Sequence, residues 1–282
     1  MLDTRYYDRS ITTLGDNTDY ITDLLGHAAR TLMGSLQENW FYRTLINSAE
    51  RGATWRLIGS QVVFSRINTT SWFGTAENPY NGDAWDGKAP LPRWKQYISI
   101  PPLTSHHAGY MANKARTLQT LYDHNIGNNI FLAGDTHLNW ATDLVWLGEE
   151  SYDQITGAGA LGAEFAGTAV SSPSSFGADS TILECNEQSQ ALIDDNVELQ
   201  WQEGYYRGYY ELQISAEKVE AQYFGAPSLV TRNGFEVSLA NFTVLEGGNR
   251  LERPVAGGRV ESGALQRGDV VMTNLTRDTN TG

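Results

Sequence analysis

The first two thirds of the chain alternate helical and extended hydrophobic patterns, as α/β domains do. A capping-box pattern at Ser35-Leu36-Gln37-Glu38 predicts a helix that begins there and runs to about Ala49. Arg51-Gly52 is expected to end this helix. Its mainly apolar face is predicted to contain Leu36, Trp40 and either Arg43 or Ile46.

The segments that follow predict buried strands and a second helix. The apolar, β-branched run from Trp55 to Phe64 suits a buried parallel strand, and Asn129–Ala133 is a short apolar strand that ends at Gly134-Asp135. Glu164–Val170 is expected to form another strand. The spacing i, i+4, i+7 and i+11 predicts one helical face made of Met111, Ala115, Leu118 and Tyr122.

The pattern changes near Gly208, where apolar and polar residues begin to alternate. This alternation predicts two paired strands exposed on one face, whose apolar positions are Tyr210, Leu212, Ile214, Val219, Ala221 and Tyr223. From Ser228 the chain is β-like and rich in glycine, with several turn signals. We therefore expect an α/β (α+β) region over residues 1–227 and a β-rich C-terminal tail over 228–282.

Composition narrows the possible functions. The 282 residues are 40% apolar and 11% aromatic, which is a globular composition, and no stretch approaches the roughly 20 apolar residues of a membrane helix. The net charge of −13 argues against nucleic-acid binding, and an anionic substrate would need positive charge from elsewhere, such as a bound metal. The single cysteine, Cys185, excludes an internal disulfide. Glycosylation sequons at Asn68, Asn241 and Asn274 are equally explained by chance.

The sharpest chemical feature is Gly134-Asp135-Thr136-His137, which directly follows an apolar strand. Ligand sites of α/β sheets gather at the carboxyl ends of strands. In an extended backbone residues i and i+2 point the same way, so Asp135 and His137 are expected to converge. A carboxylate with an imidazole suits calcium, manganese, iron or zinc. The alternative is a strand-end turn with a hydrogen-bonded histidine.

Two other polar segments are weaker candidates. In Asp83-Ala84-Trp85-Asp86-Gly87, Trp85 and Asp86 are candidate pocket residues, although the segment also has the composition of a turn. Gly15-Asp16-Asn17-Thr18-Asp19 spells the Gly-Asp-x-x-Asp of dinuclear phosphoesterases, but no buried strand precedes it and we interpret it as a surface loop. The chain has no Gly-x-Ser-x-Gly elbow, phosphate-binding loop or dinucleotide fingerprint.

Several separated segments together resemble the PhoD-type alkaline phosphatases, in order and spacing, from about residue 1 to 225. They are Leu2–Asp8, Gly59–Phe64, Asp83–Gly87, Phe131–His137, Glu164-Phe165 with Ser171–Pro173, and Arg207–Tyr209. The resemblance implies a calcineurin-like metallophosphoesterase fold, which is a β-sandwich flanked by helices with metals at its edge. It also implies calcium and iron (Ca²⁺ and Fe³⁺) as cofactors, a secreted or extracellular protein, and hydrolysis of phosphomonoesters or phosphodiesters by a metal-activated water.

The resemblance assigns roles to few residues of this chain. Asp135 and His137 match the last metal-ligand motif of the family and are carried over as metal ligands. Trp85 and Asp86 match a motif near the active site, without an assigned role. The family's earlier ligands lie upstream of the segment at Leu2, and no Asn-His dipeptide occurs in this chain.

These departures leave three readings open. The chain is the C-terminal part of an active enzyme, or an inactive truncated or degenerate protein with residual metal binding, or a half-enzyme that a partner chain completes. In each case the isolated chain is expected to be inactive, because two ligands do not make a catalytic metal centre. A sheet edge that lacks its first strands is also expected to be unpaired.

A second departure is the proline-rich segment Lys88–Gly109, which separates Trp85-Asp86-Gly87 from Tyr110. The family runs from its tryptophan motif straight to a tyrosine and a helix, so Tyr110 is interpreted as the displaced tyrosine. Lys114 stands where the family often has arginine, and Arg116 is a neighbouring basic position. We expect Lys88–Gly109 to be an irregular insertion with little burial.

Overall fold

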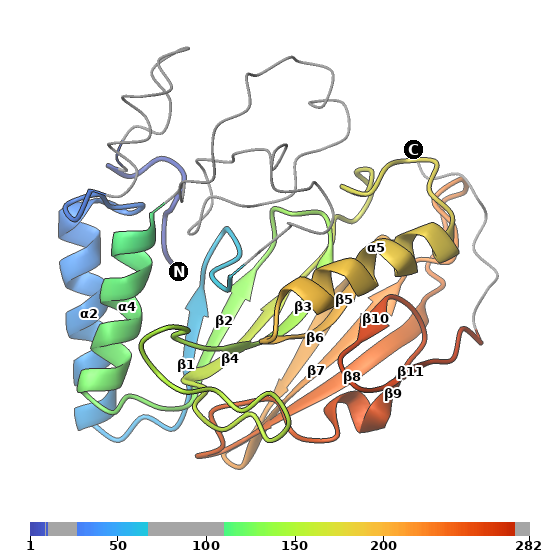
Figure 1. The fold of residues 1–282 in the computed structure, drawn as a ribbon. Helices are drawn as coiled ribbons and strands as arrows, with labels where there is room; N and C mark the ends of the chain where they lie inside the picture. Colours follow the sequence, from blue (N-terminus) through green and yellow to red (C-terminus); the bar gives the residue numbers. More distant parts are fainter. Residues whose placement is uncertain (9, 11–26, 67–109, 274–282) are drawn as a thin grey trace.

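The structure is a computed structural model, and it describes residues 1–8, 10, 27–66 and 110–273. Within these residues the chain forms a mixed α/β fold, which confirms the predicted class at that level (Figure 1). The α-helices of the described residues are α2 (Gly34–Glu50), α4 (Met111–Asp123) and α5 (Ile182–Asp195). No helix in this part of the chain is long and apolar enough to cross a membrane.

Among the described residues, the larger sheet has six strands in the order β1-β2-β4-β3-β5-β10. Their bounds are β1 (Arg56–Gly59), β2 (Asn129–Ala133), β4 (Gly162–Ala166), β3 (Asn139–Leu144), β5 (Leu199–Glu203) and β10 (Ala264–Leu265). Strands β1, β2 and β4 are parallel, whereas β3 runs antiparallel to both of its neighbours. The carboxyl ends of β1 and β2 therefore meet at one edge of the sheet, which is where the candidate site lies.

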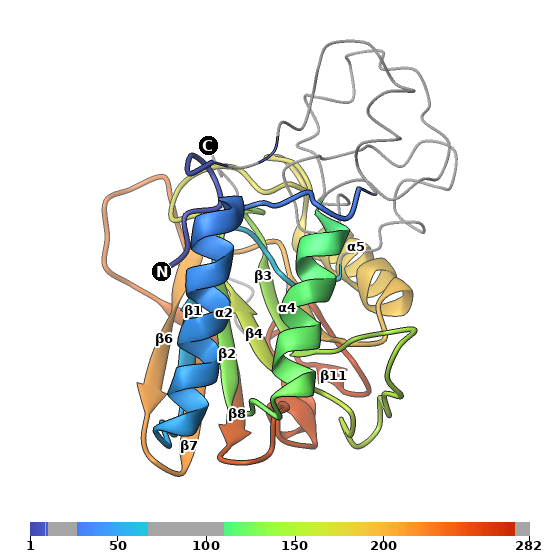
Figure 2. The same cartoon turned by 90° about the vertical axis from the view of Figure 1, so that its left-hand side faces the viewer.

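A second, antiparallel sheet consists of β6 (Gly208–Ile214), β7 (Lys218–Gly225) and β8 (Val237–Leu245). It lies on the opposite face of the larger sheet from α5 (Figures 1 and 2). Strands β6 and β7 are the predicted alternating pair, and the buried residues of β7 alternate as expected. Strand β8 pairs with β7, and β10 pairs with β5. Each of the two sheets therefore contains strands from before and after residue 227. The short elements η2 (Val255–Gly258), β9 (Arg259–Val260) and β11 (Asp269–Val270) complete the C-terminal region.

Aromatic rings fill the space between the two sheets. The Trp201 ring of β5 lies 4.9 Å from the Tyr223 ring of β7 and 5.3 Å from the Phe242 ring of β8. A separate cluster joins α2 and α4 to the β1 end of the larger sheet, and in it Phe64 stacks on Phe131 at 4.3 Å. These two clusters are the hydrophobic core of the described residues.

Both predicted helices are present, but their predicted apolar faces are confirmed only in part: Leu118 is buried and Ile46 packs against the core, whereas the other large apolar members are exposed. Leu36 is 69% exposed and Trp40 48% exposed, and α2 instead buries Gly34, Glu38, Phe41, Leu45 and Ser48. Helix α4 likewise exposes Met111 and Tyr122 and buries Asn113, Lys114, Thr117, Leu118 and Leu121. The reason is that polar side chains, which a hydrophobicity pattern places in solvent, lie between the two helices.

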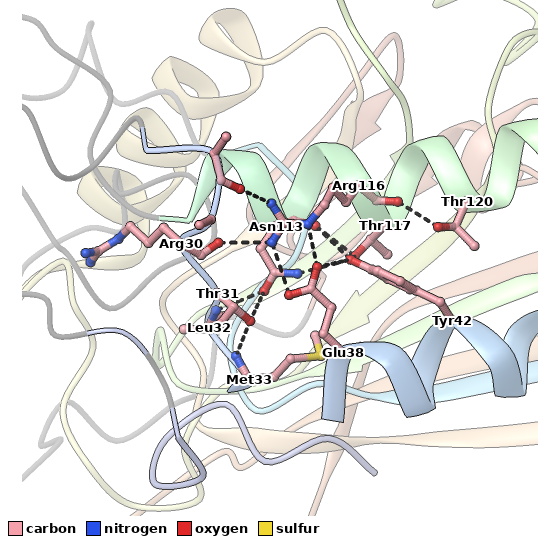
Figure 3. A network of polar contacts seen from close by, with 12 residues as sticks. Arg30, Thr31, Leu32, Met33, Glu38, Tyr42, Asn113, Arg116, Thr117 and Thr120 are labelled. Atoms are coloured by element: carbon pink, nitrogen blue, oxygen red, sulfur yellow. Dashed lines mark hydrogen bonds and ion pairs between the residues drawn. The ribbon is translucent and has the colours of Figure 1, made fainter. Parts of the chain in front are cut away.

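Figure 3 shows this polar network, in which side chains of α4 point toward α2. The Arg116 guanidinium donates to both carboxylate oxygens of Glu38, at 2.5 and 3.1 Å. Asn113 Oδ1 accepts the backbone N–H of Leu32 at 2.9 Å, and Tyr42 Oη donates to Glu38 Oε1 at 2.9 Å. The network ties the segment before α2 to both helices, so these buried polar groups have partners.

Three element boundaries also differ from expectation. Helix α2 begins at Gly34, and its N-cap, Met33, makes no side-chain cap, so the predicted capping box at Ser35 is wrong. The strand from Trp55 is parallel as predicted but ends at Gly59. Strand β4 ends at Ala166, short of the predicted Val170, because the backbone N–H of Thr168 donates to the Asn139 side chain instead of continuing a ladder.

Several predictions fall outside the described residues. They concern Trp85 and Asp86, the insertion Lys88–Gly109, the loop Gly15–Asp19, and the sequons at Asn68 and Asn274.

Candidate functional site

The candidate site is the turn that follows β2, over residues 134–138. Asp135 has a φ of +71° and His137 a φ of +56°, both in the left-handed region that non-glycine residues seldom adopt. The backbone here is not extended, so the alternation used to predict convergence of the two side chains is wrong. Strained residues of this kind persist where the surrounding structure holds them, and they concentrate at functional sites.

Side chains from three other places hold this turn. Ser175 Oγ donates to the Thr136 carbonyl at 2.6 Å, and Thr168 Oγ1 donates to the His137 carbonyl at 3.0 Å. Trp140 Nε1 donates to Thr136 Oγ1 at 2.8 Å. The carbonyls on either side of the His137 Cα are thus both bonded, and this fixes the direction in which the His137 side chain leaves the backbone.

The imidazole of His137 is oriented by a backbone carbonyl. His137 Nδ1 lies 3.0 Å from the Pro173 carbonyl oxygen. A carbonyl oxygen only accepts, so Nδ1 carries the hydrogen and Nε2 of the neutral ring has the lone pair. Metal-binding histidines show this arrangement, in which the nitrogen that does not bind the metal donates to a carbonyl or carboxylate. His137 is half-buried, and the arrangement suits an Nε2 ligand.

The Asp135 side chain is 26% exposed, and its carboxylate forms an ion pair with Arg5. Arg5 belongs to an N-terminal segment that lies against the carboxyl ends of β1 and β2. In that segment the Leu2 backbone N–H donates to the Gly59 carbonyl at 2.8 Å, and Thr4 Oγ1 and its backbone N–H both donate to Gln61 Oε1. This segment is among the family-like segments of the sequence, in which Arg5 has no assigned role.

A buried glutamate lies in the same sheet, behind the strand ends. Glu164 of β4 is 0% exposed, and its two oxygens accept the backbone N–H groups of Phe64 and Ser65, each at 2.7 Å. Burial raises the pKa of Glu164, and the bonds from Phe64 and Ser65 oppose that rise. The N–H groups of Phe64 and Ser65 thus serve a side chain instead of a strand partner.

The basic residues noted in the sequence take different positions. Lys114 is buried, with Nζ 5.7 Å from the centroid of the Phe64 ring, and Arg116 forms the ion pair with Glu38. Tyr110 is fully buried at the start of α4 and donates from Oη to the Ser10 carbonyl at 2.6 Å. These three residues anchor helices in the described structure.

Asp135 and His137 offer the donor set of a metal site, namely a carboxylate oxygen and an oriented imidazole nitrogen. Across the described ranges, no three His, Cys, Asp or Glu side chains come together as a group that could hold a metal ion. The two residues therefore fit a metal as part of a ligand set, and the set needs further members to become a catalytic centre.

The fold is mixed α/β with two packed sheets, and a strained Asp-x-His turn follows the carboxyl end of one strand. These features define a class of protein rather than a single activity. Comparison with known proteins identifies the family. The family model described as PhoD-like phosphatase matches residues 1–223. The chain therefore belongs to the PhoD-like phosphatase family.

Similarity to individual proteins supports this family assignment. Over 271 residues the chain is 27% identical to "Alkaline phosphatase D" of Bacillus subtilis (strain 168), a match that covers 96% of this chain and 39% of that protein. A solved structure titled "Structure of PhoD" is similar with a TM-score of 0.62 and 25% identity, over 95% of this chain and 42% of the other. The chain thus spans about two fifths of the length of these relatives.

Proposed function

We propose that this chain forms part of a metal-dependent phosphoesterase, in which Asp135 and His137 are two of the metal ligands. The observation that carries the proposal is the His137 ring, whose Nδ1 is bonded to the Pro173 carbonyl and whose Nε2 is left for a ligand. The family membership supports a phosphate ester as the substrate. Calcium and iron are the proposed metals, and phosphomonoesters or phosphodiesters the proposed substrates.

The residues of the chain have defined tasks in this proposal. Asp135 supplies a charged oxygen and His137 a neutral nitrogen, and the bonded turn keeps the two backbones in place before any metal binds. When bound, the metals supply Lewis-acid neutralisation of the phosphoryl oxygens and acidify a water. This source of positive charge reconciles a chain of net charge −13 with an anionic substrate.

The remaining ligands are proposed to come from polypeptide other than the described residues, either an N-terminal segment of a longer protein or a partner chain. Strand β1 supports this, because it forms an edge of the larger sheet and pairs only with β2 among the described strands. Main-chain groups on such an edge can pair with further strands. A secreted or extracellular protein is also proposed from the family resemblance, and fractionation of cells and medium from the source organism tests it.

The second candidate is a non-enzyme that retains weak metal binding. It is favoured by the observation that the described residues bring no third ligand side chain to Asp135 and His137. The two candidates differ in whether supplying the missing polypeptide produces activity.

The test is complementation. The chain is mixed with the part of alkaline phosphatase D that lies outside the matched region, with calcium and iron present, and hydrolysis of p-nitrophenyl phosphate is followed. We expect little activity from either part alone and activity from the mixture. Asp135→Asn and His137→Ala should each lower the activity of the mixture at least about 10-fold, because loss of even an outer-shell partner of a metal ligand typically costs about 10–100-fold.

The matched control is His124→Ala, which changes an exposed histidine at the end of α4 and should leave the activity of the mixture unchanged. A mixture that stays inactive while calorimetry still detects calcium binding that His137→Ala weakens would favour the non-enzyme. Activity that survives both ligand substitutions would contradict the proposal.

A further inference from the structure

The Pro173 carbonyl can orient His137 only if the loop that contains it is itself held in place. Ser174 Oγ donates to the Gly204 carbonyl at 2.6 Å, which joins this loop to the end of β5. Arg207 reaches the same loop, since its Nη1 lies 3.4 Å from the Ser172 carbonyl. The peptide that precedes Pro173 is therefore contacted by a guanidinium.

The Arg207 side chain is buried and held by several contacts, so it can fix the position of the loop that contains Pro173. Its side chain is 1% exposed, and Nη2 donates to the Gly204 carbonyl at 2.9 Å and the Tyr206 carbonyl at 3.1 Å. The guanidinium thus contacts carbonyls of two segments, the turn after β5 and the loop that contains Pro173. Its planar fork of donors allows this, whereas a lysine ammonium presents donors from a single point.

A buried carboxylate balances this buried charge. Glu203 is fully buried and accepts the backbone N–H groups of Tyr205 at 2.6 Å and Tyr206 at 2.9 Å. Burial raises the pKa of Glu203, and the bond from the Tyr206 N–H and the Arg207 charge oppose that rise. The turn between the two charges is therefore fixed at both ends.

Glu203 is also connected to His137 by a second path. Asn139 Nδ2 donates to Glu203 Oε2 at 2.9 Å, and Asn139 Oδ1 accepts the Thr168 backbone N–H at 3.0 Å. Thr168 in turn donates from Oγ1 to the His137 carbonyl. One path thus ends on the His137 ring and the other on its backbone, and both begin at the turn after β5.

We propose that Arg207 is a positioning residue for His137. Through the loop at Ser172 and Pro173 it fixes the tautomer and direction of the imidazole, so that Nε2 is available as a metal ligand. The proposed consequence for metal binding rests on the proposed function, whereas the tautomer itself does not. A role of this kind gives a physical reason for the occurrence of Ser171–Pro173 and Arg207–Tyr209 among the family-like segments.

The experiment is nitrogen NMR of the metal-free chain labelled with ¹⁵N-histidine, at a pH where the imidazoles are neutral. The chain has five histidines, and the His137 signals are assigned by their absence in His137→Gln. In the natural sequence we expect hydrogen on Nδ1 and the shift of an unprotonated nitrogen on Nε2. In Arg207→Lys and Arg207→Met we expect the population to move toward the form with hydrogen on Nε2.

Two further variants separate positioning from folding. Arg253→Met removes a different arginine, one paired with buried Asp143, and should destabilise the protein without changing the His137 tautomer. If the Arg207 variants do not fold, Ser174→Ala leaves Arg207 in place, removes the bond to the Gly204 carbonyl and the one from the Phe176 backbone N–H, and should shift the same signals part of the way. The proposal is overturned if the natural sequence has hydrogen on Nε2, or if folded Arg207 and Ser174 variants keep the natural tautomer population.

A second readout is metal affinity, measured by calorimetry with Mn²⁺. Loss of an outer-sphere partner typically lowers metal affinity about 10–100-fold, and we expect Arg207→Lys to fall in that range. A fixed tautomer in a chain that shows no activity on complementation would count against the proposed function and leave the role of Arg207 intact.

Discussion

At the scale of single residues, the site depends on conformations that side-chain identity does not encode. Asp135 and His137 could be selected from the sequence because they directly follow an apolar strand. Their left-handed backbones could not be predicted, because they are stabilised by Thr168 and Ser175, which lie more than 30 residues further along the chain. The partner of the His137 ring could not be predicted either, because it is a backbone carbonyl and every residue has one.

Glu164 gives a prediction for pH dependence. Burial raises its pKa above the ordinary value of 4.5, so the folded protein keeps this proton over a range where the unfolded chain has released it. The free energy of unfolding should therefore fall as pH rises above 4.5, until the folded pKa is passed. Glu164→Gln should lose less stability over this range, as measured by urea unfolding at a series of pH values.

The control for this prediction is Glu211→Gln, at an exposed glutamate of β6, whose stability curve should parallel that of the natural sequence. If the curve of Glu164→Gln also runs parallel, the pKa of the buried carboxyl is not raised by folding.

At the scale of elements, the helices show what hydrophobic periodicity can and cannot predict. Sequence periodicity located α2 and α4 to within a few residues, but it identified only part of the face that each helix buries. The buried faces contain Glu38 and Asn113, whose polar groups are satisfied by each other's helices and by the segment before α2 (Figure 3). A pattern scored on hydrophobicity cannot recognise a buried polar residue before its partner is known.

A buried ion pair attaches the C-terminal region to β3. Asp143 is fully buried, and its oxygens accept from the Leu251 backbone N–H at 2.8 Å, from Tyr152 Oη at 2.8 Å and from Arg253 Nη2 at 2.5 Å. Removing one member of a buried pair leaves a charge without compensation, which costs about 3–5 kcal/mol. We expect Arg253→Met to lose stability of that order in urea unfolding.

The double variant Asp143→Asn with Arg253→Met should lose less than the sum of the two single changes, because no unpaired charge remains. Arg250→Met is the control, since this neighbouring guanidinium donates to the Gly248 carbonyl instead of a buried carboxylate. Additive losses would show that the two side chains do not stabilise the fold as a pair.

At the scale of the whole molecule, the C-terminal region is part of the core. Phe242 of β8 lies between the sheets, with its ring 5.3 Å from that of Trp201 and 5.7 Å from that of Tyr223. The division expected at residue 227 separates strands that pair with each other and share these rings. A single cooperative unfolding unit would follow from this packing.

Phe242→Ala tests this directly. Truncating a buried phenylalanine costs about 3–5 kcal/mol, and the loss should appear in one transition that includes both sheets. The neighbouring Asn241→Ala changes an exposed residue of the same strand and should alter stability by no more than about 0.5 kcal/mol. Measurement is by urea unfolding, followed both by tryptophan fluorescence and by far-UV circular dichroism. Two separate transitions would show that the C-terminal region unfolds as an independent unit.

The sequence by itself determined the family, the mixed α/β class, the positions of α2, α4, β1, β2, β4, β6 and β7, and Asp135 and His137 as the pair to test. These depend on local composition and on the order of short segments, which are properties of the chain. Only the tertiary structure decided which helix faces are buried, that residues on both sides of 227 share two sheets, and that a carbonyl orients His137. Each of these depends on contacts between segments far apart in the sequence, where the partner of a buried polar group is known only once the chain has folded.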